Sequence, residues 1–313
     1  MKQTILGAGG AIGSGLATEL ARYSTDIRLV SRNPRKINDG DELFPADLTS
    51  RESVFKAIEG SGIVYVTVGF EYKTAVWREL WPSFMRNVLD GCKQYDAKLV
   101  FFDNVYAIGK DHVGHITEES PISPTSRKGE VRAEVDRMIL KEMERGSVKA
   151  IIARSADFFG VDRKTSIVMT MVYDNLAKGK TAQWMCDADK IHSISYTPDL
   201  SKGTAMLGNT PDAYGQVWNL PTDPGRITGR GWVNLFAREM NTGNECQVLP
   251  NWLIKGLGLF IPIMRELPEM NYQFDRDYYF DSSKFNRMFN YVPTSHEDAV
   301  KVTVEKLRSM AQA

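Results

Sequence analysis

The sequence has few of the residues that build disulfide frameworks and metal centres. Its 313 residues include only three cysteines and four histidines. Cys92, Cys186 and Cys246 lie far apart and are odd in number, and no Cys/His group has metal-ligand spacing. We therefore expect no disulfide framework and no metal site, and we expect a reducing, cytoplasmic setting.

The chain also lacks an excess of either charge. Lys+Arg and Asp+Glu both number 39, so the formal net charge at pH 7 is +0. A balanced chain has no overall electrostatic attraction to nucleic acid or to an acidic membrane surface. Neither kind of partner is predicted.

Long hydrophobic runs, repeats and low-complexity tracts are missing as well. The most apolar late segment, Trp252–Met264, is shorter than the ~20 apolar residues that cross a bilayer. We expect it to be a helix packed over a pocket, with a membrane or partner surface as the alternative. Met1-Lys2-Gln3 leads directly into the first expected strand, which predicts no signal peptide.

Glycine, in contrast, is concentrated near the start of the chain. A short apolar strand runs into a glycine cluster that opens an amphipathic helix. Glycines let the backbone turn sharply and approach a phosphate, and a helix N-terminus attracts anions. The pattern predicts a dinucleotide pyrophosphate site, with a tight turn that binds nothing as the alternative. The predicted binding residues are Gly7, Gly10, Ala11, Ile12 and Gly13.

Strands and helices are expected to alternate after this point. The expected strands are 26–30, 41–45, 63–68, 99–102, 150–154, 191–196 and 216–220. The expected helices are 49–60, one from Pro82, 127–144, 167–177, 198–207, 231–240 and 297–310. This alternation predicts an α/β fold with a doubly wound parallel (Rossmann) sheet. We expect residues 1–160, with 190–222 returning, to form the dinucleotide-binding domain, and 161–189 and 223–313 to form a smaller C-terminal substrate lobe.

The glycine cluster Gly7-Ala8-Gly9-Gly10-Ala11-Ile12-Gly13 resembles the motif of short-chain dehydrogenases/reductases, in the extended or atypical branch that includes NAD-dependent epimerases and dehydratases. Further segments are similar to motifs of that family: 46–48, 105–106, 116–121, 153–160 and 215–220. The resemblance implies a nicotinamide cofactor and a small hydroxyl- or carbonyl-bearing substrate. It also implies a possible homodimer through helices 82–95 and 127–144.

Positions after the later strands complete the expected cofactor site. Asp47-Leu48 is similar to the Asp-Leu that contacts adenine in the family, and Val68 ends the 63–68 strand with Gly69 directly after it. The second strand ends at Ser31-Arg32, where a carboxylate would instead favour NAD. Because a guanidinium suits a 2′-phosphate, we predict NADP over NAD, with a solvated Arg32 as the alternative.

The family's catalytic Tyr-x-x-x-Lys is missing. Alignment through the preceding segment puts Lys128 in the place of the tyrosine and Arg132 in the place of the lysine. Asp103 stands where the resemblance expects Ser or Thr. The usual acid–base group is therefore absent from this sequence.

Three interpretations remain open. Lys128 could be the ribose ligand or proton donor, unless it and Arg132 form an ordinary solvated helix face. Tyr106 could supply the phenol. The leading prediction is an NADP-dependent oxidoreductase or epimerase/dehydratase-like enzyme with Lys128 and Tyr106 as catalytic candidates. The alternative is a non-catalytic, NADP-binding redox sensor, similar to regulatory members of the atypical branch.

Overall fold

The computed structural model describes residues 1–163, 165–257 and 262–312. The chain divides into two compact units. Unit 1 contains Met1–Ala107, Ile122–Ser155 and Leu200–Leu220, and unit 2 contains Ile108–Pro121, Ala156–Asp199 and Pro221–Ala313. The expected division gave all of 190–222 to the dinucleotide-binding domain, whereas only Leu200–Leu220 of that stretch falls in unit 1.

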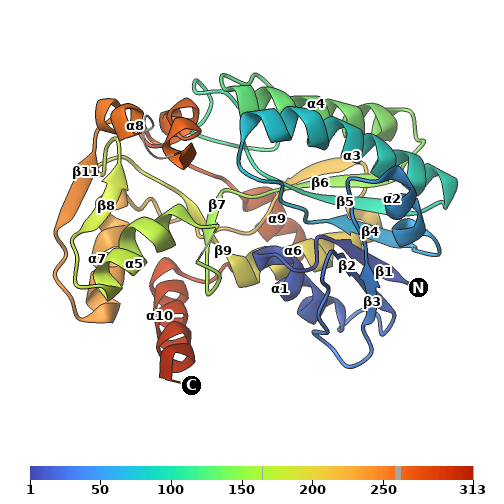
Figure 1. Cartoon of the computed structure of the whole chain (residues 1–313), viewed down its shortest axis with the longest axis horizontal. Coiled ribbons are helices and arrows are strands. Elements are labelled where there is room, and N and C mark those ends of the chain that lie inside the picture. Colours follow the sequence, from blue (N-terminus) through green and yellow to red (C-terminus); the bar gives the residue numbers. More distant parts are fainter. Residues whose placement is uncertain (164, 258–261, 313) are drawn as a thin grey trace. The chain divides into compact units, whose positions relative to one another are not determined.

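A parallel, seven-stranded sheet forms the centre of unit 1 (Figure 1). Its order is β10-β6-β5-β4-β1-β2-β3, and the chain works outward from β1 in both directions. The strands are β1 (Gln3–Leu6), β2 (Ile27–Ser31), β3 (Glu42–Pro45), β4 (Ile63–Val66), β5 (Lys98–Asp103), β6 (Ala150–Arg154) and β10 (Gln216–Asn219). All six pairings between neighbours are parallel. The predicted doubly wound α/β fold is confirmed.

Helices cover both faces of this sheet (Figure 1). On one face lie α1 (Ala11–Leu20) and the unit 1 part of α6 (Thr197–Gly208). On the other lie α2 (Arg51–Ile58), α3 (Thr74–Gln94) and α4 (Arg127–Glu144). Apolar residues of these three helices and of the sheet form one buried core, as the apolar strand runs predict.

The helix predicted to start near Pro82 begins earlier, at Thr74, and contains Pro82 in its interior. A proline inside a helix costs about 3 kcal/mol, because it removes a hydrogen bond and crowds the preceding turn. Here the turns before the proline carry Trp77 and Trp81, which are 6% and 2% exposed. Burial of these two large rings offsets that cost, so α3 extends through the proline.

Unit 2 is built from short elements. Two parallel strand pairs join β7 (Asp157–Phe159) with β9 (Ile194–Tyr196) and β8 (Ala182–Met185) with β11 (Cys246–Leu249). The helix predicted at 167–177 is instead a π-helix, η1 (Met169–Tyr173), continued by α5 (Asp174–Ala177). The other elements are α7 (Gly229–Met240), α8 (Asn251–Leu257), η3 (Pro262–Arg265), η4 (Pro268–Gln273), α9 (Ser283–Phe289) and α10 (His296–Gln312).

The apolar segment predicted at Trp252–Met264 is only partly described. Its start lies in α8 and its end in η3, while residues 258–261 of that prediction lie outside the described residues. Trp252 is 73% exposed. Within the described part of the chain, no helix has the length and apolar character needed to cross a membrane.

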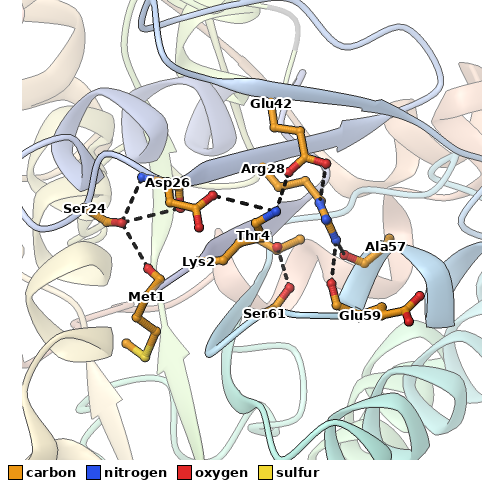
Figure 2. A network of polar contacts seen from close by, with 10 residues as sticks. All are labelled: Met1, Lys2, Thr4, Ser24, Asp26, Arg28, Glu42, Ala57, Glu59 and Ser61. Carbon is orange, nitrogen blue, oxygen red and sulfur yellow. Dashed lines mark hydrogen bonds and ion pairs between the residues drawn. The ribbon is translucent and has the colours of Figure 1, made fainter.

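Charged side chains join the starts of three neighbouring strands of unit 1 (Figure 2). Lys2 Nζ lies 2.7 Å from Glu42 Oε2, and Arg28 Nε lies 3.0 Å from Glu42 Oε1. Arg28 Nη1 also donates to the carbonyl oxygens of Ala57 and Glu59 at 2.8 Å. We call Lys2, Arg28 and Glu42 the amino-edge network, because they lie at the amino ends of the parallel strands.

Candidate functional site

The turn between β1 and α1 requires glycine at two positions. Gly7 has φ +99°, and a Cβ there would lie 2.6 Å from the backbone nitrogen of Val68. A Cβ on Gly13 would lie 2.6 Å from the carbonyl oxygen of Gly7. Both contacts are shorter than real carbon atoms allow, so the β1–α1 turn can form only around these two glycines.

Gly10 is different, because nothing inside the protein demands it. It is exposed, and a Cβ there would meet no atom closer than 3.7 Å. Gly10 is the N-cap of α1, where no side chain caps the helix and no acidic residue occupies the first turn. No side chain therefore caps the first N–H groups of α1, and no acidic residue neutralises the positive end of the helix dipole. This cradle fits the pyrophosphate of a dinucleotide.

The remaining residues predicted to bind cofactor follow three neighbouring strands. Ser31 ends β2 and Arg32 comes next, exposed. Asp47 and Leu48 follow β3. Hydrogen bonds from the backbone and hydroxyl of Thr49, with a smaller contribution from the charge of Arg32, lower the pKa of the Asp47 carboxyl.

Val68 and Gly69 follow β4, and the backbone of Val68 passes beside Gly7. Carboxyl ends of parallel strands meet at one edge of a sheet, so these positions share the edge where ligands bind in such folds. Ala11 and Ile12 begin α1 at the same turn.

Lys128 lies on the second residue of α4, and its side chain is fully buried at 0% exposed. Ser126 caps this helix by accepting a hydrogen bond from the Gly129 N–H at 3.0 Å. Arg132, one turn further along, is 3% exposed. The interpretation of Lys128 and Arg132 as a solvated helix face is therefore wrong, because both side chains point into unit 1.

Hydroxyl and aromatic groups surround the Lys128 ammonium. Its Nζ donates to Thr74 Oγ1 at 3.2 Å and lies 4.5 Å from the ring centroid of Tyr72. The Tyr72 hydroxyl donates to the Tyr106 hydroxyl at 3.4 Å. The structure thus brings both catalytic candidates against Tyr72, with Lys128 over its ring and Tyr106 at its hydroxyl. We call Tyr72, Thr74, Tyr106 and Lys128 the lysine cage.

Asp103 and Arg132 are bound to each other. Arg132 donates its Nε to Asp103 Oδ1 at 2.8 Å, and its Nη2 donates to the same oxygen. The guanidinium also lies 4.4 Å from the Trp81 ring and 4.7 Å from the Phe101 ring. The residues aligned with the Ser/Thr and the lysine of the family are thus paired as a buried salt bridge.

A second buried pair adjoins the first. Arg154 Nη2 donates to Asp136 Oδ2 at 3.2 Å, and Arg154 Nε lies 3.9 Å from Asp103 Oδ2. Burial, followed by the nearby charge of Asp103, raises the pKa of Asp136 to about 8. We call Asp103, Arg132, Asp136 and Arg154 the buried ion cluster.

Sequence reasoning missed most of these partners. Lys128, Arg132 and Asp136 recur at four-residue spacing, which places them on one face of a helix and was a usable signal. Tyr72 and Thr74 carried no such signal, since they precede a helix that was expected to begin later. Among the described residues, no group of three or more His, Cys, Asp or Glu side chains could hold a metal ion.

A parallel Rossmann sheet with a glycine turn at its first helix is the arrangement typical of dinucleotide-binding folds. A profile of the NAD dependent epimerase/dehydratase family matches residues 4–220. The chain therefore belongs to the NAD dependent epimerase/dehydratase family, which confirms the resemblance. No curated protein matches the sequence.

Several solved structures share the fold along nearly the whole chain. A UDP-glucose 4-epimerase from Thermus thermophilus, solved with NAD, has a TM-score of 0.78 at 16% identity, covering 98% of this chain and 99% of that one. A UDP-glucuronic acid 4-epimerase from Bacillus cereus, with UDP-glucuronic acid and NAD, has a TM-score of 0.81 at 14% identity, covering 99% and 100%. A dTDP-glucose 4,6-dehydratase from Streptomyces venezuelae, with NAD, has a TM-score of 0.79 at 15% identity, covering 99% and 97%.

Proposed function

We propose that the protein binds a nicotinamide dinucleotide at the glycine turn and catalyses hydride transfer on a small substrate that bears a hydroxyl or carbonyl group. The observation that carries the proposal is the uncapped start of α1 behind Gly10, a glycine that internal packing does not require. When bound, the nicotinamide ring exchanges a hydride with a substrate carbon.

The lysine cage would handle the accompanying proton. Lys128 is the first candidate for the group that exchanges a proton with a substrate oxygen, and the Tyr106 hydroxyl is the second. Arg132 is poorly suited to hold the cofactor ribose as the family lysine does, because its Nε and Nη2 both donate to Asp103. In this proposal, Lys128 and Tyr106 take over the role that the family gives to the Tyr-Lys pair.

The choice between NAD and NADP rests on opposing observations. The compared structures are complexes with NAD, which favours NAD. Arg32 follows β2 directly and is exposed, and its fork is suited to a 2′-phosphate. Our prediction of NADP therefore depends on Arg32 alone. The cytoplasmic location and the homodimer remain predictions too.

Cofactor titration tests the binding part of the proposal. NAD(H) and NADP(H) affinities would be measured by protein fluorescence for wild type, Gly10→Ala and Arg32→Ala. We expect Gly10→Ala to weaken both cofactors while melting at the wild-type temperature, because its Cβ meets only the ligand. We expect Arg32→Ala to weaken NADP(H) alone. Gly40→Ala, whose Cβ would lie 3.5 Å from the nearest atom, is the matched control.

Equal affinities in Gly10→Ala and Gly40→Ala would place the cofactor elsewhere. Unchanged NADP(H) affinity in Arg32→Ala would remove the preference for NADP.

A substrate screen tests the reaction. Carbonyl compounds and sugar nucleotides, the latter chosen from the names of the compared enzymes, would be assayed with both reduced cofactors. Lys128→Ala should lose most of the turnover and Tyr106→Phe part of it. Full activity in both variants would contradict the assigned roles. Cofactor binding with no turnover on any substrate would favour the redox sensor.

A further inference from the structure

We propose that unit 2 carries a further binding site, a cavity in which Arg163 binds the carboxylate of a small organic acid with an apolar body. The cavity has a volume of about 490 Å³ and is lined by the chain after β7, by residues of η1 and α5, and by the end of α10. Cavities of about 300–1,000 Å³ hold small ligands in many proteins. All of its lining residues belong to unit 2, whereas the glycine turn belongs to unit 1, so this inference goes beyond the proposed function.

Arg163 brings an open hydrogen-bonding edge to this cavity. Its Nη1 donates to Asp174 Oδ1 at 2.5 Å, and its Cζ lies 5.8 Å from the centroid of the Tyr173 ring. No group among the described residues accepts a hydrogen bond from its Nε or its Nη2. Because these two nitrogens form the side-on fork that binds a carboxylate with two parallel hydrogen bonds, the open edge favours an acid as the ligand.

Arg230, another arginine of unit 2, shows the same edge when a carboxylate of the protein occupies it. Its side chain is 47% exposed, as is that of Arg163. Arg230 donates its Nε to Asp189 Oδ1 at 2.9 Å and its Nη2 to Asp189 Oδ2 at 3.4 Å. In Arg163 the bond to Asp174 uses Nη1 instead, which leaves the fork for a carboxylate from outside the chain.

The Arg163 guanidinium is held in position by packed neighbours. The Tyr173 ring beneath it is buried and makes an edge-to-face contact with Phe236, at a centroid distance of 6.3 Å and an interplanar angle of 69°. Asp174 follows Tyr173 directly and begins α5. Tyr173 ends the π-helix η1, a rare geometry that is frequent at functional sites. A fork that is fixed before binding lowers the entropy cost that a ligand must offset.

Apolar side chains supply a surface for the body of the acid. Val161, Leu307 and Met310 all line the cavity. Val161 and Met310 are 43% and 65% exposed, so a ligand that covers them removes apolar surface from water. The Asp162 carboxylate lines the cavity as well, which makes an organic amine the competing ligand. We favour the acid because the open donors belong to Arg163, while the Asp174 carboxylate is already paired with it.

Methyl NMR on the full chain tests this site. The Met310 methyl signal, identified by its absence in Met310→Gln, would be followed during titration with octanoate, octanol and octylamine, which share one apolar chain. We expect saturable shifts with octanoate, weaker binding of octanol and the weakest binding of octylamine. Arg163→Gln should weaken octanoate binding about tenfold, because it removes a charge-assisted contact. Arg163→Lys, which keeps the charge without the fork, should weaken it less, and Arg230→Gln is the matched control.

Several results would overturn the assignment of this cavity. Equal affinities for octanol and octanoate, or equal octanoate affinities in Arg163→Gln and wild type, would mean that Arg163 does not recognise a carboxylate. Tighter binding of octylamine would assign the cavity to organic cations. A Met310 signal that does not saturate with octanoate would mean that acids of this kind do not occupy the cavity. None of these results depends on cofactor or turnover, so the proposed function is tested separately.

Discussion

The amino-edge network and the buried ion cluster lie at opposite edges of the same sheet. The pKa of a carboxyl group is lowered in the first and raised in the second. In the amino-edge network, the side chains of Lys2 and Glu42 are 21% and 39% exposed. In the buried ion cluster, no side chain is more than 3% exposed. Both networks pair basic side chains with carboxylates, and their carboxylates differ in burial.

Burial reverses the direction of the carboxyl pKa. At Glu42, desolvation opposes ionisation, but hydrogen bonds from Lys2 and Arg28 outweigh it and lower the pKa. At Asp136, burial dominates, the charge of Asp103 adds to it, and the pKa rises to about 8 although two arginines lie nearby. The partly exposed Glu42 is kept ionised by its partners, whereas the buried Asp136 holds its proton close to neutral pH.

The comparison also bears on why each network exists. Exposed ion pairs contribute about 0–1 kcal/mol, and buried ones often add no net stability relative to apolar side chains of the same size. Arg132 and Asp136 of the buried ion cluster lie on the helix that carries Lys128, and the resemblance aligns Asp103 and Arg132 with positions that the family uses for catalysis. We interpret it as a support for the lysine cage rather than as a source of stability.

The largest effect is expected from unpairing the buried ion cluster. Arg132→Met leaves the Asp103 carboxylate buried without the guanidinium that pairs with it, and should lower the free energy of unfolding by about 3–5 kcal/mol. Urea denaturation would measure it. The double variant Asp103→Leu/Arg132→Met, which removes both charges, should recover most of the loss. A loss of under about 1 kcal/mol in the single variant would mean that burial is not what separates the two networks.

A smaller effect is expected from the pH dependence of stability. The pKa of Asp136 is about 8 in the folded protein against 3.8 for the free group. Between those values the folded state holds a proton that the unfolded state has released. The stability contributed by this group is complete below the lower value and declines as the pH rises through the higher one. Urea unfolding from pH 5 to 9 should show this decline.

Asp136→Asn cannot ionise and should flatten the pH profile between pH 5 and 9. Asp90→Asn, a partly exposed aspartate paired with Arg51, should leave the profile as it is in the wild type. A profile that is equally steep in Asp136→Asn would assign the pH dependence to other groups.

The smallest effect is expected at the amino edge. Lys2→Met removes one partner of Glu42 while Arg28 still binds the carboxylate at 3.0 Å. The loss of stability should be at most about 1 kcal/mol and should shrink in concentrated salt, because exposed charges are screened. Urea denaturation at low and high salt measures both quantities. A loss of stability that does not depend on salt and is as large as that of Arg132→Met would contradict the expected difference between the two networks.

The sequence predicted unit 1 well, because its signals are local and repeated. The strand–helix alternation predicted the sheet, and the expected helix 127–144 coincides with α4. The start of α3 was missed because the proline rule gives the cost of Pro82 but not the compensating burial of Trp77 and Trp81. That burial depends on where β5 and α4 lie, which a local pattern does not specify.

Unit 2 and the cage were harder to predict for a related reason. Strands β7, β8 and β11 have three or four residues each, too few for a periodic pattern to emerge. The sequence showed that a phenol was missing at Lys128, but it did not show that Tyr72, 56 positions earlier, lies against that lysine. A contact between distant positions leaves no mark on the spacing of either segment.

The face of α4 that carries Lys128, Arg132 and Asp136 makes the site sensitive to helical register. One residue inserted just before Lys128 would rotate the rest of the helix by about 100°. Val131 and Val135 would then fill the places of Arg132 and Asp136, and Arg132 would move to the buried place of Ala133. One continuous helix thus holds two interleaved patterns, one for packing and one for ions. A single length change would therefore leave the Asp103 carboxylate facing a valine in the place of the Arg132 guanidinium.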